Sequence, residues 1–403
     1  MLYQFSFQNF KSYRSETTID FQANELPEFQ DSLLSATPES TKALPLGVVY
    51  GPNGGGKSNL LQAFCCMVST VVSPIRDLRK NRITSIFQQT SSAIPFSFDT
   101  NSFNCPTEFV VYFYKNGNDY RYYLSILHDV VISESLERRK CGARRSAMIF
   151  DRDEGEIHLG ASIRSKHINT DINEKMPFLS FLAINYNIPV IAEVQEWFES
   201  CIIANYANHN TDSQILYPKN DNLKKDMINL LNHVDIDITD YRIDEANNRI
   251  YTQRIIDGNQ YELPLEYESD GTTKLLCLLP LIVVALAEGR LIVLDEFDAK
   301  LHPNLLRYII MLFRNPEINQ HHAQLLFTAH DISIMKNTVF RRDEIWFASE
   351  NDQHESELYS LYDIRQENNN RVNHTAAYYK QYLEGRYGAD PYLRNILDGG
   401  DWA

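Results

Sequence analysis

The sequence lacks the features that mark secreted, membrane-spanning and metal-stabilised proteins. Its longest apolar run, Leu275 to Ala287, has 13 residues and contains a proline, so it is too short to span a bilayer and favours a buried core helix. The first residues, MLYQFSFQNF, alternate apolar and polar side chains like a strand, without the apolar core of a signal peptide. The six cysteines include no C-x-x-C pair, which argues against a zinc site and a disulfide framework. We therefore expect a cytoplasmic protein with no membrane partner.

Positive charge is also scarce. Lys and Arg number 38 against 53 Asp and Glu, which gives a net charge of −15. This balance excludes a nucleic-acid coat, because counterion release needs clustered basic side chains. Two basic runs, RDLRKNR (76–82) and LERRKCGARR (136–145), are local exceptions. Runs like these usually form solvated faces, but they leave contact with nucleic acid or with an acidic partner open.

The chain does contain regular strand and helix patterns. Its 403 residues, 43% hydrophobic and 23% charged, are typical of a soluble globular protein. The patterns predict strands at the start and at 46–50, a helix over about 58–72, hairpins at 109–127 and 147–160, a helical stretch from 176 to 235, two strands around 255–267, helices at 272–288 and from Pro303, and strands at 291–296, 323–329 and 343–348. Alternating strands and helices near the C-terminus predict a mainly parallel sheet covered by helices, with the earlier strands as an antiparallel layer. The sequence has no sustained heptads, so we expect no long coiled coil.

A glycine-rich turn at positions 51–58 carries the strongest chemical signal. It fits G-x-x-x-x-G-K-[ST] at every fixed position and lies between an apparent strand and a helix. Glycines let backbone N–H groups point into one concavity, and the start of the helix adds its positive end. We expect Lys57 to reach the terminal phosphates of a nucleotide and the Ser58 hydroxyl to bind Mg²⁺. The predicted nucleotide-binding residues here are Gly51, Pro52, Asn53, Gly54, Gly55, Gly56, Lys57, Ser58 and Asn59; the alternative is a plain glycine turn.

Acidic residues follow a second buried strand, in LIVLDEFD (291–298). Four apolar residues in a row suit a strand that is buried on both faces of a parallel sheet. At its end Asp295 would hold Mg²⁺, and Glu296 would orient or deprotonate an attacking water; the alternative is a strand that simply ends in exposed acids. FTAH (327–330) puts His330 at the end of another strand, where crevices form in parallel sheets. A lone histidine is more often structural.

The order of these motifs resembles the head of ABC-type ATPases, in the branch that includes the SMC, RecF and OLD-like proteins. The resemblance makes Lys57, Glu296 and His330 catalytic, with His330 as the switch histidine. It also matches Ser269 and Gly271 to the signature motif and Asp298 to the D-loop. The segment Asn9 to Tyr13 looks like the N-terminal strand-turn of this branch, which would put Lys11 near the nucleotide.

A narrower resemblance is to bacterial ABC-type ATPases of phage-defence and abortive-infection systems, the RloA/AbiLi-like and Septu PtuA-like group. It rests on ESDGT (268–272), LDEFDAKLHP (294–303) and the tail YYKQYLEGRYGADP (378–391). It implies an Mg²⁺-dependent ATPase that binds ATP and forms a homodimer, or a higher even-numbered oligomer, through its ATP sites. Such ATPases usually control a separately encoded nuclease or Toprim-type effector, and nucleic acid is a further possible partner. A RecF/SMC-like DNA-maintenance ATPase and a nucleotide-stabilised scaffold stay open as alternatives.

The same resemblance implies an α/β fold in which the chain is one composite ABC-type P-loop head. Its N-terminal lobe would cover about 1–160, an inserted and mostly helical subdomain about 161–240, and the C-terminal lobe about 241–403.

Two features depart from the motif pattern of ABC-type ATPases. Asp270 stands where transporters have glycine and would repel a triphosphate unless it caps the helix, and the glutamine loop has only Gln88 and Gln89 as candidates.

Overall fold

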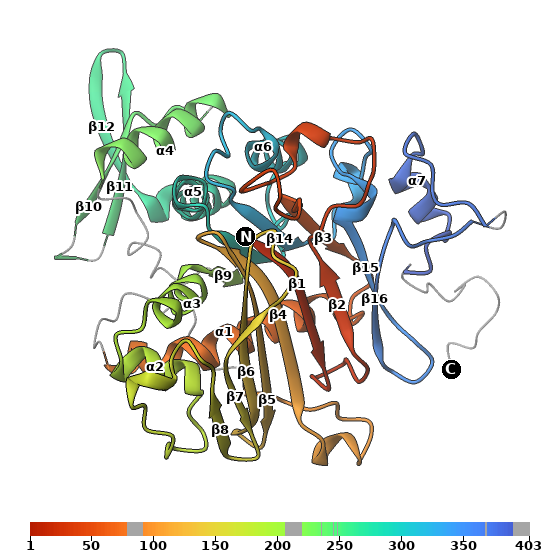
Figure 1. Ribbon diagram of the computed structural model, residues 1–403. Coiled ribbons are helices and arrows are strands. Elements are labelled where there is room, and N and C mark those ends of the chain that lie inside the picture. Colours follow the sequence, from red (N-terminus) through yellow and green to blue (C-terminus); the bar gives the residue numbers. More distant parts are fainter. Residues whose placement is uncertain are drawn as a thin grey trace, which may run out of the picture.

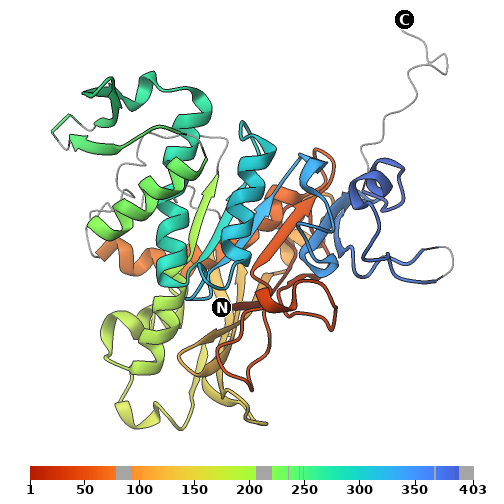
Figure 2. The same cartoon turned by 90° about the horizontal axis from the view of Figure 1, so that it is seen from above.

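The computed structural model describes residues 1–78, 92–205, 220–234, 236–244, 246–247, 249–366 and 369–389. These residues form an α/β fold in which two large sheets enclose helix α1 (Lys57–Leu78), and further helices cover the outer face of the second sheet (Figure 1). The view from above shows the helices of the C-terminal half side by side over that face (Figure 2). The α/β class predicted from the sequence, with a mainly parallel sheet, an antiparallel layer and no long coiled coil in the described residues, is confirmed.

The first sheet is antiparallel and has seven strands in the order β2-β1-β4-β5-β6-β7-β8. Its strands are β1 (Leu2–Gln8), β2 (Thr17–Asp20), β4 (Thr107–Lys115), β5 (Asn118–Leu127), β6 (Val130–Lys140), β7 (Ala147–Asp153) and β8 (Glu156–Leu159). The two predicted hairpins are the β4–β5 and β7–β8 pairs. Asn116 and Gly117 join β4 to β5 with φ of 47° and 82°, as the two-residue turns of hairpins require.

The second sheet has six strands in the order β16-β15-β3-β14-β13-β9. Its strands are β3 (Leu46–Tyr50), β9 (Ile202–Asn205), β13 (Leu291–Asp295), β14 (Gln324–Thr328), β15 (Ile345–Glu350) and β16 (Ser356–Ser360). All neighbours are parallel except β15 and β16. Every residue of β3, β13 and β14 is buried, which fits the short apolar runs at their centres.

One part of the helical stretch predicted for 176–235 is wrong. Helices α2 (Phe178–Asn185), α3 (Pro189–Ser200) and α4 (Asp221–His233) lie there, but α3 ends at Ser200 and β9 follows it. Strand β9 adds to the edge of the sheet in parallel with β13. A short apolar run such as CIIA (201–204) fits a helix or a strand equally well. Pairing with a strand that lies about 90 residues later decided it.

The remaining helices are α5 (Asp270–Glu288), α6 (Pro303–Arg314) and α7 (Tyr378–Leu383), and a small antiparallel sheet contains β10 (Asp240–Asp244), β11 (Arg249–Ile256) and β12 (Asn259–Pro264). Short 3₁₀ turns lie at Gln30–Ser32, Ser102–Asn104, Arg164–Lys166, Leu265–Tyr267, Ile332–Ile334 and Arg342–Glu344. The α-helices in the described residues have 6 to 22 residues, so none is a coiled-coil arm. By length and composition α1 and α5 could cross a membrane. More than half of the apolar window of each is nevertheless buried inside the molecule, as in core helices.

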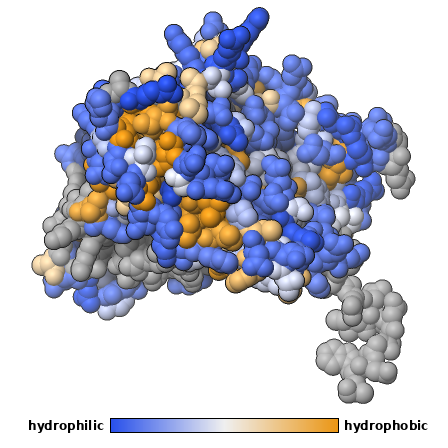
Figure 3. All heavy atoms as spheres, turned by 60° about the horizontal axis from the view of Figure 1, so that its bottom comes forward, coloured by the Kyte–Doolittle hydropathy of each residue, from blue (hydrophilic) through white to orange (hydrophobic). Residues whose placement is uncertain are grey.

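The surface is mostly hydrophilic but carries hydrophobic patches on one face. Figure 3, with the bottom of Figure 1 turned forward, shows these patches between polar side chains. Large exposed apolar side chains among the described residues include Phe98, Phe103 and Met148.

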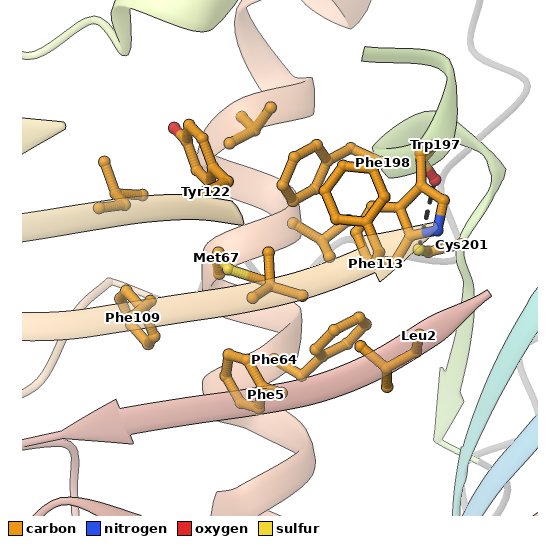
Figure 4. Close-up of a cluster of buried hydrophobic side chains, with 14 of the residues drawn as sticks. Leu2, Phe5, Phe64, Met67, Phe109, Phe113, Tyr122, Trp197, Phe198 and Cys201 are labelled. Atoms are coloured by element: carbon orange, nitrogen blue, oxygen red, sulfur yellow. Dashed lines mark hydrogen bonds between the residues drawn. The ribbon is translucent and has the colours of Figure 1, made fainter. Parts of the chain in front are cut away.

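An aromatic core fixes α1 against the antiparallel sheet (Figure 4). The ring of Phe64 on α1 packs edge-on against Phe5 of β1, with their centroids 5.1 Å apart. On β4, Phe113 stacks on Trp197 of α3 at 4.0 Å. Burial of such rings contributes several kcal/mol of stability, about 2 kcal/mol for each fully buried side chain. The start of α1, and with it the glycine-rich turn, therefore has a rigid support.

Candidate nucleotide site

The glycine-rich turn is shaped by close approach of its backbone to the neighbouring strands. It connects β3 to α1, which begins at Lys57. A side-chain carbon at Gly51 or Gly55 would lie 2.0 or 2.6 Å from the carbonyl oxygen of Ala348 on β15. At Gly56, where φ is 102°, such a carbon would lie 2.3 Å from Ser356 Oγ. These three positions therefore admit only glycine, and the turn is pressed against β15 and β16.

Lys57 lies inside this turn. Its side chain is almost fully buried, and Nζ donates hydrogen bonds to the carbonyl oxygens of Gly51 at 2.8 Å and Pro52 at 2.9 Å. Burial lowers the pKa of Lys57, while three nearby carboxylates act in the opposite direction, namely Asp295, Asp298 and Glu296. The structure thus brings the lysine and the acids at the end of β13 together at one edge of the sheet.

A hydrogen-bonded chain links the start of α1 to the ends of two parallel strands. Asp295 Oδ1 accepts from Ser58 Oγ at 3.1 Å and from Thr328 Oγ1 at 2.6 Å. Thr328 Oγ1 also accepts from the backbone N–H of Glu296 at 2.7 Å. Sequence reasoning assigned no role to Thr328. Its only signal was a hydroxyl at the end of a buried strand beside the strand that carries Asp295.

The turn after β13 presents side chains without partners. Glu296 has φ of 53°, in the left-handed region that is uncommon for residues other than glycine. Its carboxylate makes no hydrogen bond or ion pair with the described residues, and neither does the exposed imidazole of His330. The carboxylate of Asp298 instead accepts from the backbone N–H groups of His330, at 2.7 Å, and Asp331. Hydrogen bonds to backbone N–H groups hold the turn, so the Glu296 carboxylate and the His330 imidazole are available to contact a ligand.

The N-terminal loop packs along the first two turns of α1. Lys11 has φ of 52°, and its Nζ donates to Gln62 Oε1. Asn59 Nδ2 donates to Ser12 Oγ at 2.8 Å. Burial lowers the pKa of Lys11. Since Gln62 lies one helical turn after Ser58, Lys11 lies beside α1 rather than in the glycine-rich turn.

The signature-like residues lie at the start of α5. Ser269 is the N-cap, and its Oγ accepts from the backbone N–H of Thr272 at 3.2 Å. Asp270 forms an ion pair with Lys300 at 2.8 Å, so Ser269 supplies the cap and a lysine offsets the charge of Asp270. A side-chain carbon at Gly271 would lie 3.6 Å from the carbonyl oxygen of Lys300. Among the described residues no hydrogen bond or ion pair joins Ser269 or Gly271 to the glycine-rich turn.

Three further sequence motifs are the glutamine-loop candidates and the two basic runs. The glutamine-loop candidates Gln88 and Gln89, and most of the basic run 76–82, lie outside the described residues. The second basic run begins in β6, a strand that the sequence did not predict. There Arg139 pairs with Asp119 at 2.9 Å, so part of its charge is used within the sheet.

The side chains at this edge suit a magnesium nucleotide. Serine hydroxyl and carboxylate oxygens are the ligands that Mg²⁺ prefers, and Ser58 and Asp295 already lie within hydrogen-bonding distance. The backbone of the turn opens at the N-terminus of a 22-residue helix, which favours anions. In the described part of the chain, no group of three or more His, Cys, Asp or Glu residues could hold a metal ion by itself. The fit therefore depends on a nucleotide that completes the coordination.

Comparison with known proteins identifies one family, and the solved structures similar to this chain include two Smc heads. No curated protein matches the sequence. The Smc head bound to the C-winged helix domain of ScpA is 13% identical, with a TM-score of 0.41 over 89% of this chain and 97% of that one. The Smc head with an extended coiled coil bound to the C-terminal domain of ScpA, from Pyrococcus furiosus, is 13% identical, with a TM-score of 0.40 over 90% of this chain and 96% of that one.

Residues 46–336, more than two thirds of the chain, match a family described as "AAA domain, putative AbiEii toxin, Type IV TA system". The match supports the resemblance to abortive-infection ATPases, and the chain belongs to this family of AAA-domain proteins.

Proposed function

We propose that this protein is the ATP-binding and ATP-hydrolysing subunit of a bacterial anti-phage defence system of the abortive-infection type. It dimerises around ATP and controls a separately encoded nuclease or Toprim-type effector in the cytoplasm. The contact of Ser58 with Asp295 beside the buried Lys57 is the observation that carries the ATPase part. The family description, which names an AbiEii toxin and a type IV toxin–antitoxin system, supports the defence part.

Each residue at the site has a chemical role in this proposal. Lys57 exchanges the carbonyl oxygens of its own turn for the terminal phosphates of ATP. Ser58 and Asp295 would hold Mg²⁺, which when bound neutralises phosphate charge. The free carboxylate of Glu296 orients the attacking water and takes its proton, and the imidazole of His330 contacts the terminal phosphate. The backbone N–H groups of the glycine-rich turn, together with Asn59, hold the remaining phosphate oxygens.

The second half of each site comes from another subunit. Ser269 and Gly271 lie at the start of α5, with no hydrogen bond to the glycine-rich turn of their own chain in the described residues. A helix N-terminus capped by a serine is a good phosphate ligand. The pairing of Asp270 with Lys300 removes much of the repulsion that a carboxylate would cause there. ATP bound between the turn of one subunit and the α5 start of its partner would close a dimer, and Asp298 would lie at that interface.

The decisive experiment compares two substitutions at the same edge of the sheet. Lys57→Ala should abolish ATP binding, because the buried ammonium is the cation nearest the phosphates. Glu296→Gln keeps the shape of the side chain but cannot accept a proton, so it should bind ATP, lose hydrolysis by about a hundredfold or more, and accumulate as a dimer. Nucleotide binding, phosphate release and light scattering with ATP measure the three properties. Hydrolysis by Glu296→Gln at the wild-type rate would refute the role of Glu296.

The defence role has its own test. Cells that carry the chain together with its neighbouring genes should lose protection against phage when Lys57→Ala is introduced. The purified effector should change its activity on adding the chain with ATP. Protection that persists with Lys57→Ala would separate any defence role from ATP binding.

A further inference from the structure

A groove of about 690 Å³ lies at the open edge between the two large sheets. Strand β2 and the loop before it line one side, β16 lines the other, and Trp346 of β15 lies between them. We call it the edge groove, defined by residues 15–18, 20, 346, 355–359 and 363. Strands β2 and β16 run side by side in this part of the molecule (Figure 1). None of the glycine-rich-turn residues lines it, but its Ser356 borders Gly56 of that turn.

Both strands that line the edge groove are outer strands. In the described residues β2 is the last strand of the seven-stranded sheet and β16 the last strand of the six-stranded sheet. An outer strand leaves every second backbone N–H and C=O without a partner in the ladder. Such groups are a template for one more strand, and peptides in extended conformation bind proteins in this way.

The edge groove is strongly acidic. Of its five carboxylates, Glu355 pairs with Arg14 at 3.4 Å. The described residues give no ion pair to the other four, which are Glu16, Asp20, Glu357 and Asp363. Burial raises the pKa of Asp20 more than its hydrogen bonds with Gln22 lower it, and the charges of Asp343 and Asp363 add smaller upward contributions. The groove therefore favours a positively charged occupant and repels the phosphates of nucleic acid.

Trp346, one of the residues that line the groove, carries a buried donor without a partner in the described part of the chain. Trp346 is 7% exposed, and its indole N–H has no hydrogen-bond acceptor among the described residues. A buried donor without an acceptor costs about 1–3 kcal/mol. A backbone carbonyl oxygen that enters the groove could accept from this N–H after a shift of the Trp346 ring, because the nitrogen itself is buried, whereas a bare metal ion or an ammonium group could not accept from it.

We propose that the edge groove binds an extended segment of another protein, rich in lysine or arginine, which adds as a strand to β2 or β16. The acidic side chains select its charge, the two outer strands select an extended backbone, and Trp346 supplies one further donor. Ser356 of the groove donates from its backbone N–H to the Ser12 carbonyl oxygen at 2.7 Å, and it approaches Gly56 of the glycine-rich turn. The segment would thus lie next to the nucleotide site, but its binding does not require ATP hydrolysis.

The test measures fluorescence anisotropy of a labelled peptide of alternating lysine and valine, mixed with the full chain. Saturable binding is expected, and a glutamate–valine peptide should not bind. A lysine–proline peptide carries the same charge but cannot form a ladder, so it should bind at least about tenfold more weakly. Equal binding of the lysine–valine and lysine–proline peptides would overturn strand addition.

Matched charge reversals locate the site on the chain. Glu16→Lys with Glu357→Lys should weaken binding of the lysine–valine peptide by about tenfold or more. Glu154→Lys with Glu156→Lys makes the same charge change in the β7–β8 turn and at the start of β8, the opposite outer strand of the seven-stranded sheet, and should weaken binding by no more than about threefold. Trp346→Phe keeps an aromatic ring without the N–H and should cost about threefold to tenfold. Equal losses in the two charge-reversal variants, or no saturable binding to the wild type, would overturn the proposal.

Discussion

At the scale of single residues, the site depends on polar atoms that each make two hydrogen bonds. Asp295 Oδ1 accepts from Ser58 and Thr328, and the Thr328 hydroxyl both donates to Asp295 and accepts from the backbone of Glu296. Thr328 is fully buried. One hydroxyl therefore orients both acids at the end of β13.

Replacing Thr328 with valine tests this arrangement. Valine has the same shape but no hydroxyl, so the N–H of Glu296 loses its acceptor in a buried place. We expect stability to fall by about 1–3 kcal/mol, measured by urea unfolding, and ATP turnover to fall by about tenfold or more, because Glu296 is no longer held. Thr328→Ser keeps the hydroxyl and should stay within about threefold of wild type. Turnover by Thr328→Val at the wild-type rate would show that Thr328 does not position Glu296.

At the scale of elements, α5 is held to the turn that follows β13. Lys274 on the second turn of α5 is 1% exposed, and its Nζ donates to the carbonyl oxygen of Ala299. The ion pair of Asp270 with Lys300 joins the same two segments. The signature-like residues and the acidic turn should therefore move as one unit.

The buried lysine gives this connection a pH dependence. Burial, followed by the charge of Lys300, lowers the pKa of Lys274 from 10.5 to about 8. Between pH 8 and 10.5 the unfolded chain binds more protons at this residue than the folded chain, so its contribution to stability rises with pH. Relative to Lys274→Met, the wild type should gain about 2 kcal/mol of unfolding free energy from pH 7 to pH 9.5. Urea unfolding at several pH values measures this, with Lys42→Met at an exposed lysine as the control; a difference that does not change with pH would contradict it.

At the scale of the whole molecule, the proposed site needs two chains. If the glycine-rich turn and the start of α5 meet only across a dimer, two inactive variants should complement each other. Ser269→Arg alone should lose hydrolysis while the monomer still binds ATP, and Lys57→Ala alone should lose ATP binding. A mixed dimer holds one site with both halves intact.

An equimolar mixture of Lys57→Ala and Ser269→Arg should thus recover about one quarter of wild-type turnover, because half of the randomly paired dimers are mixed and each holds one intact site of two. Phosphate release after mixing the two purified variants measures the recovery. A mixture of Lys57→Ala with the double variant Lys57→Ala/Ser269→Arg has no intact site and is the control. Absence of any recovery, with dimers present, would rule out a shared site.

Local patterns in the sequence determined the glycine-rich turn, the acids after a buried strand and the α/β class. These features depend on residues next to one another: glycines that permit a tight turn, and apolar runs that suit strands buried on both faces. The β4–β5 hairpin was predictable for the same reason, because Asn116 and Gly117 set its turn.

Only the tertiary structure decided which distant residues meet. Strand β9 was misread because its pairing with β13 cannot be inferred from a four-residue run. Ser58 meets Asp295 across 237 positions of sequence, and Thr328 meets Asp295 across 33. The edge groove likewise exists only because β2 and β16 end two different sheets side by side. Such contacts depend on how the sheets and helices pack against one another, and this packing cannot be inferred from a local sequence pattern.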